Sequence, residues 1–401
     1  MTDGQAQPAL GVHQVRALLD LAARHAVTAR GRVEPNPMVG CVLIAPGPGA
    51  PRVIGVGHHR VFGRAHAEVE AIANARARGH GTAGATALVT LEPCNHHGKQ
   101  PPCTEAILRA GVRRVVCARA DPNPLAAGGA DRLRAAGVEV VMTGASVNAT
   151  RLCDPFVKLV RTDLPWVCLK WAQTIDGRLV SASGQSQWIS GPRARARVHR
   201  LRGVSDAVIT GLGTLRADRP RLTPRQATPR RRPARVVIDA RLACAAEPGL
   251  IGPMLADAGR FPVLVVCGPD APAHLEAALV VSGVGVVRAP GDGAHGRVDL
   301  RAALAILRRD HGVCTALVEG GPALAGAMVR AGLADELLVF VGPMALAEAG
   351  ARSLADERAG PLAGLGAADR YELLDARRIG PDAQLLYRRP LDRAEALALG
   401  L

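Results

Sequence analysis

Short apolar runs alternate with segments of helical periodicity in two successive series along this chain of 401 residues. In the first series the runs MVGCVLIA and RVIGVG are separated by a Pro/Gly-rich turn, which predicts a β-hairpin. Strand and helix patterns then alternate through VEVVMTG. This alternation predicts an α/β sandwich, because helices that join strands also cover the faces of the sheet. The chain is too long for one ordinary core, so we expect two domains, residues 1–160 and 161–401.

The second series begins after a short helical stretch, NATRLCDPFVKLVRTDLP, and contains seven apolar runs from WVCLKWAQT to ELLVFVGP. Helical segments such as LRAALAILRRDHG separate several of these runs. The pattern predicts a second α/β domain with a mainly parallel sheet. Residues 345–370 are rich in Ala and Gly, and their pattern assigns them to no element.

The stretch EPCNHHGKQPPC places Cys94 and Cys103 directly after prolines, and Cys103 opens a helical segment, CTEAILRA. Proline is favoured at helix starts, and a helix N-terminus stabilises a thiolate. Upstream, RAHAEVEA begins another helix with His66 and Glu68 in its first turn. Two thiolates and one imidazole would hold zinc and leave one position open, as in catalytic sites. The expected metal ligands are therefore His66, Cys94 and Cys103.

A closed structural zinc site that uses His96 and His97 is the alternative. Zinc fingers pair cysteines two to four residues apart, whereas eight residues separate these two. The order of motifs instead matches the H-x-E…P-C-x-x-C signature of zinc nucleobase deaminases, with a longer second spacer. In that chemistry Glu68 takes a proton from water and passes it to the leaving amine. We expect His96 to face the substrate.

The chain carries 50 Lys and Arg against 35 Asp and Glu, a net charge of +15. This charge suits an anionic small molecule, or alternatively a nucleic acid, but only 2% of the residues are aromatic and could stack on bases. Most of the nine cysteines lie singly in apolar runs, which argues against a disulfide framework. The sequence has no evident signal peptide or membrane span. We therefore expect a cytoplasmic protein that binds neither membranes nor nucleic acid.

Two Gly-rich segments in the second half, TGLGTLRAD and EGGPALAGA, follow apolar runs and suit phosphate binding. There is no G-x-G-x-x-G fingerprint, so an ordinary dinucleotide-binding Rossmann domain is not supported.

The segments EPNPMVGCVL, GRAHAEVEAI and TLEPCNHHGKQPPC resemble the deaminase half of the bifunctional deaminase/reductases of riboflavin biosynthesis. The segments KWAQTIDGR, SGQSQWISG, RVHRLRG, GTLRADRPRLTPR and VEGGPALAGAMV resemble the reductase half. The resemblance implies a cytidine-deaminase-like three-layer sandwich followed by a dihydrofolate-reductase-like α/β domain. It implies zinc-dependent deamination of a phosphoribosylated diaminopyrimidinone, followed by NADPH-dependent reduction of the ribosyl chain.

Further roles come from the resemblance alone. In the deaminase half it implies that Asn36 binds the base, and it leaves Lys99 open between a phosphate contact and a solvated loop lysine. The implied NADPH contacts are Ala172, Trp188, Thr214, Asp218, Gly321, Pro322, Ala323, Leu324, Ala325, Gly326 and Ala327. The implied contacts to the substrate in the reductase half are Ser186, Arg202, Leu222, Arg225 and Glu319.

Arg202 and Arg225 are planar fork donors suited to a phosphate. No residue stands out as the proton donor for reduction. The chain departs from the family pattern at Ala65, at GKQ in the cysteine loop and within 344–370. A homo-oligomer is expected. The alternatives are a single-activity paralogue with one degenerate domain and a nucleic-acid-editing deaminase.

Overall fold

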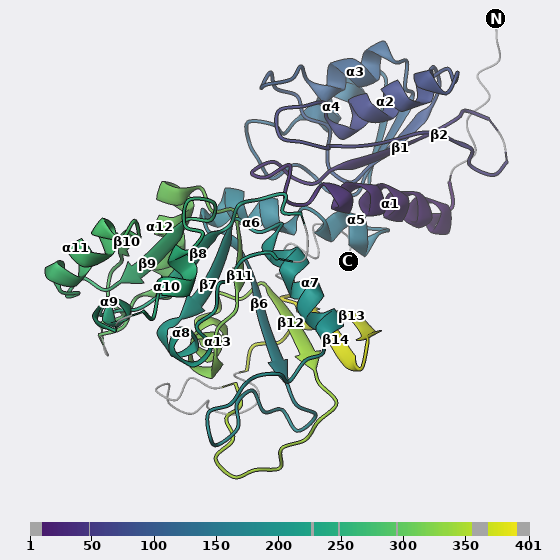
Figure 1. Ribbon diagram of the computed structural model, residues 1–401. Helices are drawn as coiled ribbons and strands as arrows, with labels where there is room; N and C mark the ends of the chain where they lie inside the picture. Colours follow the sequence, from purple (N-terminus) through teal and green to yellow (C-terminus); the bar gives the residue numbers. More distant parts are fainter. Residues whose placement is uncertain are drawn as a thin grey trace, which may run out of the picture. The chain divides into compact units, whose positions relative to one another are not determined.

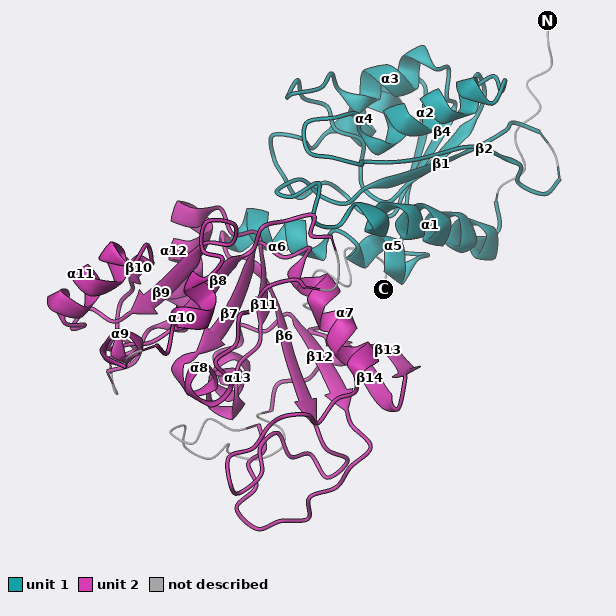
Figure 2. Cartoon of the chain, in the orientation of Figure 1, with its two compact units in different colours: residues 1–162, 391–401 teal, residues 163–390 magenta. Residues whose placement is uncertain are grey.

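The computed structural model describes residues 10–47, 49–225, 228–247, 249–293, 296–354 and 368–390. Residues 1–162 belong to a first compact unit, and residues 163–390 form a second (Figure 2). Within the described residues, every helix is too short or too polar to cross a bilayer.

The first unit contains a mixed sheet that includes β1 and β2 (Figure 1). The strand order in this sheet is β2-β1-β3-β4-β5. Its strands are β1 (Gly40–Ile44), β2 (Val53–His58), β3 (Thr86–Val89), β4 (Arg114–Cys117) and β5 (Glu139–Met142). Its helices are α1 (Val12–Ala26), the short 3-10 helix η1 (Val27–Ala29), α2 (Ala67–Ala77), α3 (Cys103–Arg109), α4 (Gly129–Ala135), α5 (Val147–Arg151) and α6 (Asp154–Thr162). Strand β1 pairs antiparallel with β2 and β3, as the hairpin prediction requires, and β3, β4 and β5 run parallel.

Alternating side chains of this sheet enter two separate cores. On β3, Ala87 and Val89 pack in the core that also contains residues of α2, α3 and α4. Leu88 between them packs in the core that contains residues of α1 and α5. Because successive residues of a strand point to opposite faces, the sheet is covered on both sides, and the predicted three-layer sandwich is confirmed.

The second unit contains a nine-stranded sheet with the order β10-β9-β8-β7-β11-β6-β12-β14-β13. Its strands are β6 (Trp166–Gln173), β7 (Ala207–Gly211), β8 (Ala234–Ile238), β9 (Val263–Cys267), β10 (Gly285–Arg288), β11 (Thr315–Val318), β12 (Glu336–Val341), β13 (Glu372–Ile379) and β14 (Asp382–Arg388). Its helices are α7 (Pro192–Arg202), α8 (Leu212–Asp218), α9 (Ala243–Ala246), α10 (Gly252–Leu255), α11 (Ala273–Val281), α12 (Leu300–His311) and α13 (Pro322–Arg330). The seven predicted strands, β6 to β12, pair in parallel, which confirms the second α/β domain.

The sequence interpretation missed the antiparallel hairpin of β13 and β14, which extends the sheet beyond β12. Most of β13 is exposed, so no alternation of buried and polar residues marks it as a strand. Of the segment 345–370, residues 355–367 lie outside the described residues.

The parallel core of the second sheet determines where ligands can bind. Strands β7, β11 and β6 are neighbours, so the loops that follow their carboxyl ends lie together at one edge, where ligands of open α/β sheets bind. Both Gly-rich segments of the sequence begin at this edge, and the first passes directly from β7 into helix α8. The second leads into α13, which starts with Gly321 as N-cap and Pro322 in its first turn.

Candidate active sites in the two units

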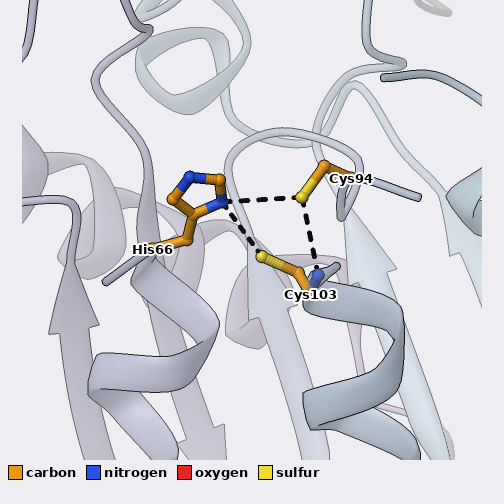
Figure 3. A group of neighbouring side chains, drawn as sticks. All are labelled: His66, Cys94 and Cys103. Atoms are coloured by element: carbon orange, nitrogen blue, oxygen red, sulfur yellow. Dashed lines mark hydrogen bonds between the residues drawn. The ribbon is translucent and has the colours of Figure 1, made fainter. Parts of the chain in front are cut away.

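In the first unit, three side chains from separate segments converge on one point (Figure 3). His66 is the N-cap of α2, Cys103 is the first residue of α3, and Cys94 lies in the loop after β3. His66 Nδ1 lies 3.2 Å from Cys103 Sγ and 3.5 Å from Cys94 Sγ. The three potential ligand atoms all lie within 4.8 Å of one another. The structure therefore brings together the three residues that the sequence predicted as metal ligands.

The electrostatics of this cluster suit a divalent cation. Hydrogen bonding from Cys103 and the proximity of His66 lower the pKa of the Cys94 thiol to about 4, against the effect of burial. The pKa of the Cys103 thiol is raised well above its usual value, because it hydrogen-bonds to Cys94 and is buried. A second thiolate is thus disfavoured without a cation to neutralise it. Two sulfurs and one imidazole nitrogen are donors that zinc prefers, and the residues present fit that ion.

Glu68 is 3% exposed in the first turn of α2. Burial, together with the negative charge of Cys94, raises the pKa of its carboxyl to about 7. Its carboxyl is within hydrogen-bonding range of the Cys103 thiol, so it lies beside the cluster without being one of its three ligands. A carboxyl group with a pKa near neutrality can both accept and release a proton at physiological pH.

His59 is a residue of this site that sequence reasoning missed. It is 3% exposed, and its ring lies edge-on to that of His66, with 5.2 Å between the ring centroids. Its Nδ1 is 3.0 Å from the carbonyl oxygen of Ala65 and therefore carries a proton. Its Nε2 lies 3.5 Å from the amide nitrogen of Asn36. The structure thus connects Asn36 through His59 to His66, one of the three predicted metal ligands. The doublet GHH in the sequence gave only a weak sign of this role.

The two remaining predicted residues of the first unit lie in the loop between the cysteines. His96 has a buried Nδ1 that finds no hydrogen-bond partner among the described residues, as expected of a group that awaits a ligand. Lys99 places its ammonium group 4.1 Å from the centroid of the Phe62 ring. Gln100 donates a hydrogen bond to the carbonyl oxygen of Gly63 (2.9 Å), which joins the two loops.

The second unit contains a cleft of about 1740 Å³ at the carboxyl ends of the central strands. Almost all predicted reductase residues line it: Ala172, Ser186, Trp188, Arg202, Thr214, Asp218, Leu222, Arg225, Glu319, Gly321, Pro322, Ala323, Leu324 and Ala327. The two exceptions, Ala325 and Gly326, are buried on the inner side of α13. These two of the predicted NADPH contacts therefore face the core and not the cleft.

The two Gly-rich segments contact each other in this cleft, through Thr214 in helix α8 and Gly321 at the N-cap of α13. Thr214 accepts a hydrogen bond from the backbone N–H of Gly321 (2.8 Å). A Cβ added to Gly320 would lie 3.0 Å from the side chain of Leu324, so a larger residue here would require Leu324 to shift. Asp218, at the end of α8, accepts hydrogen bonds from Ser186 (3.2 Å) and Gln187 (2.9 Å). The N-terminus of α13 thus lies at the cleft, a position that favours a phosphate group.

Trp188 is 63% exposed in the same cleft, and the guanidinium of Arg195 lies 4.5 Å from its ring centroid. Its ring is therefore not part of the hydrophobic core and can contact a ligand.

Arg202 and Arg225, which the sequence suggested as phosphate forks, have different surroundings. Arg202 donates two hydrogen bonds to Glu319, at 2.5 and 2.9 Å, and a third to the carbonyl of Thr223. Its fork is thus occupied. The guanidinium of Arg225 has no hydrogen-bond or ion-pair partner among the described residues. Arg225 is exposed, but partial burial and the positive charges of Arg202 and Arg221 still lower its pKa, so an anion bound there would be stabilised.

Lys170 is a second residue that sequence reasoning missed. It lies in β6, lines the cleft, and has no hydrogen-bond partner within the described part of the chain. Burial lowers the pKa of its ammonium group, and Arg202 lowers it further, whereas Glu319 and Asp218 raise it. A signal was present, because the chain contains three lysines only, Lys99, Lys158 and Lys170. A lysine poised to release its proton is a suitable general acid.

Comparisons with known proteins agree with both units. Residues 13–119 match the cytidine and deoxycytidylate deaminase zinc-binding region, and residues 165–385 match the RibD C-terminal domain. The chain is 36% identical over 381 residues to the riboflavin biosynthesis protein RibD of Escherichia coli, which covers 89% of this chain and 95% of that protein. It is 36% identical over 384 residues to RibD of Mycobacterium tuberculosis, with 94% and 98% covered.

Solved structures resemble the whole chain. Form 1 of RibD from Acinetobacter baumannii aligns with a TM-score of 0.74 and 32% identity, and covers 95% of this chain and 100% of that one. A diaminohydroxyphosphoribosylaminopyrimidine deaminase/5-amino-6-(5-phosphoribosylamino)uracil reductase from Thermotoga maritima aligns with a TM-score of 0.75 and 30% identity, with 94% and 99% covered. The predicted folds, a cytidine-deaminase-like domain followed by a dihydrofolate-reductase-like domain, are confirmed. The chain therefore belongs to the RibD family, the bifunctional deaminase/reductases of riboflavin biosynthesis.

Proposed function

We propose that this enzyme deaminates 2,5-diamino-6-(5-phosphoribosylamino)pyrimidin-4(3H)-one in its first domain, residues 1–160, and reduces the product in its second, residues 161–401. The observation that carries the proposal is that each unit holds a complete set of chemical groups. The first has three atoms that can bind a metal beside a buried carboxyl. The second has a cleft with two Gly-rich segments, a lysine, and an arginine, Arg225, whose guanidinium has no partner among the described residues.

In the deaminase, His66, Cys94 and Cys103 hold zinc, which when bound supplies a Lewis acid that activates water near neutral pH. Glu68 accepts a proton from the attacking water and delivers it to the leaving amine. The ring carbon thus exchanges its amino group for oxygen, and ammonia leaves. The amide of Asn36, held by His59, and the imidazole of His96 orient the pyrimidine ring.

In the reductase, NADPH supplies a hydride when it is bound. The ribosyl group becomes the ribityl chain when this hydride adds to the anomeric carbon. The bond between the anomeric carbon and the ring oxygen breaks, and the ring oxygen takes up a proton. Lys170 donates the proton. The Arg202–Glu319 ion pair holds one positive and one negative charge at fixed positions near the Lys170 ammonium group. Thr214, Asp218, Trp188, Ala172 and the loop after Gly320 contact the cofactor, while Ser186, Leu222 and Arg225 bind the substrate, with Arg225 at its phosphate.

Three finer points belong to the same proposal. The substrate is a small molecule and nucleic acid is not a partner, which the two Tyr, four Phe and three Trp of the whole chain support. The enzyme acts in the cytoplasm, which its nine cysteines support because all of them are free thiols. The enzyme forms homo-oligomers. Strand β13 lies at the edge of the sheet in the described residues, so a second copy of the chain can pair with it and cover its exposed Leu373 and Leu374.

Mass spectrometry of the products, with and without NADPH, tests the proposed function. Without NADPH, the diaminopyrimidinone substrate gains the mass difference between a hydroxyl group and an amino group, because the amine is replaced by an oxygen that carries or transfers one hydrogen. With NADPH, that product gains two further hydrogens. The first change without the second would leave a deaminase with a degenerate reductase domain. Retention on DNA or RNA columns at physiological salt would instead support a nucleic-acid-editing deaminase.

A further inference from the structure

A strained loop, Arg219–Arg225, carries two of the proposed substrate contacts in the second unit. Leu222 has a φ of 54° and is 2% exposed, and Arg219 has a φ of 42°. Residues other than glycine rarely adopt this left-handed conformation, which persists only where the surroundings enforce it. The loop therefore needs strong contacts to keep Arg225 directed into the cleft.

Helix α7 holds one side of this loop. The Nδ1 of His199 lies 3.1 Å from the carbonyl oxygen of Thr223, and Arg202 donates to the same oxygen at 3.2 Å. Both side chains also line the cleft. This side of the loop is thus fixed by residues of the proposed active site itself.

The other side is held by residues outside the cleft. Arg235 on β8 is 0% exposed, and its Nη1 donates to the carbonyl oxygen of Arg221 (3.1 Å) and to Asp257 Oδ1 (2.5 Å). Its Nη2 donates to the carbonyl of Phe261 (2.5 Å). The second oxygen of Asp257 accepts a hydrogen bond from the Arg221 side chain (3.1 Å). Arg235 and Asp257 thus bind both the main chain and the side chain of Arg221.

A buried arginine is retained at a high desolvation cost, and the pairing with Asp257 offsets that cost. Neither Arg235 nor Asp257 lines the cleft, so neither can touch the substrate. Their contacts to Arg221 act on the loop, whose next residues are Leu222 and, three further on, Arg225.

We propose that Arg235 and Asp257 are positioning residues that hold the Arg219–Arg225 loop in its strained form, and so determine the preference of the reductase for a phosphorylated substrate. The proposal rests on the proposed function of the second domain. The loop is preorganised, so binding of the phosphate at Arg225 does not incur the entropic cost of ordering the loop. Loosening the loop should weaken phosphate recognition and leave the cofactor loops unchanged.

The test compares reduction of the deaminated phosphoribosyl substrate with reduction of its dephosphorylated analogue by the full-length enzyme. Arg235→Lys keeps the charge but cannot bridge all three acceptors, and Arg235→Met removes it. For both variants we expect KM for the phosphorylated substrate to rise roughly 10- to 100-fold. KM for the dephosphorylated analogue and the Kd of NADPH, measured by fluorescence, should change less than about twofold. The enzyme would thereby lose its discrimination between the two substrates.

Arg288→Met is the matched control. Arg288 also pairs with a carboxylate, Glu276, and donates to main-chain oxygens of Pro269 and Ala271, but it does not line the cleft. This variant should discriminate like the wild type. If Arg235→Met does not fold, Arg235→Lys and Asp257→Asn carry the test, with thermal unfolding as the check on folding.

Folded Arg235 variants with wild-type discrimination would overturn the proposal. Equal losses for both substrates and for NADPH would also overturn it, since they indicate general destabilisation. A wild-type enzyme that reduces neither substrate would contradict the proposed function itself, a separate outcome.

Discussion

Arg202 and Glu319, 117 residues apart in the sequence, form a two-pronged ion pair in the reductase cleft, with Nε–Oε1 and Nη2–Oε2 distances of 2.5 and 2.9 Å. Both side chains are mostly buried. The pair lies at the junction of helix α7 and strand β11, and Lys170 interacts with its charges. The same ion pair therefore contributes to the stability of the second unit and acts on the pKa of Lys170, the proposed proton donor.

This pair should make stability depend on pH. Burial alone would raise the pKa of Glu319, but Arg202 and Lys170 outweigh it and the net pKa is lowered. A lowered pKa in the folded state means that the stabilisation is complete above the unfolded value of about 4.3 and is lost as the pH falls through the folded value. Urea unfolding of Glu319→Gln and wild type should differ by about 3 kcal/mol at neutral pH. The difference should shrink as the pH falls below the unfolded value and through the lowered folded value, and a constant difference would contradict this account.

Lys170→Met should abolish the proposed proton donor. We expect kcat for reduction to fall at least about 100-fold, with the Kd of NADPH nearly unchanged, because general acid catalysis contributes at that level. Lys158→Met, which alters a lysine of the first unit, serves as control and should reduce normally. Normal reduction by a folded Lys170→Met enzyme would remove this residue from the mechanism.

Cys94→Ser or Cys103→Ser should lose both zinc, measured by elemental analysis, and deamination. Serine is a poor zinc ligand, and an open site with two protein ligands binds weakly. NADPH-dependent reduction of the deaminated intermediate should survive, because the cleft lies wholly within the second unit. Removal of zinc from the wild type with a chelator should reproduce this pattern. Loss of reduction in a folded variant would show that the two activities depend on each other.

Glu68→Gln should retain zinc and lose deamination, since glutamine can neither accept nor release the proton. The expected loss in kcat is at least about 100-fold. Zinc content and deamination are measured on the same preparation, so a variant that has lost its metal cannot be mistaken for one that has lost its base. Normal turnover would exclude Glu68 from proton transfer.

Much of the first site could be predicted from sequence because its chemistry is local. His66 and Glu68 share one helical turn, and Cys94 and Cys103 flank one loop, so short motifs carry both residue type and spacing. The alternating apolar runs likewise predicted the parallel strands β6 to β12, since strands buried on both faces read as continuous apolar segments. The hairpin of β13 and β14 was missed for the converse reason, because its exposed residues carry no such pattern.

The sequence by itself determined the two α/β units, the three predicted metal ligands and the Gly-rich segments, all of which depend on patterns within a few neighbouring residues. Only the tertiary structure decided which charged groups act together. Among 50 lysines and arginines, nothing local distinguishes Arg202, paired with Glu319, from Arg225, which has no partner among the described residues, or from Arg235, buried beside the Arg219–Arg225 loop. Those differences arise from the packing of strands and helices that are distant in sequence, because burial and pairing of a charge depend on what surrounds it in space.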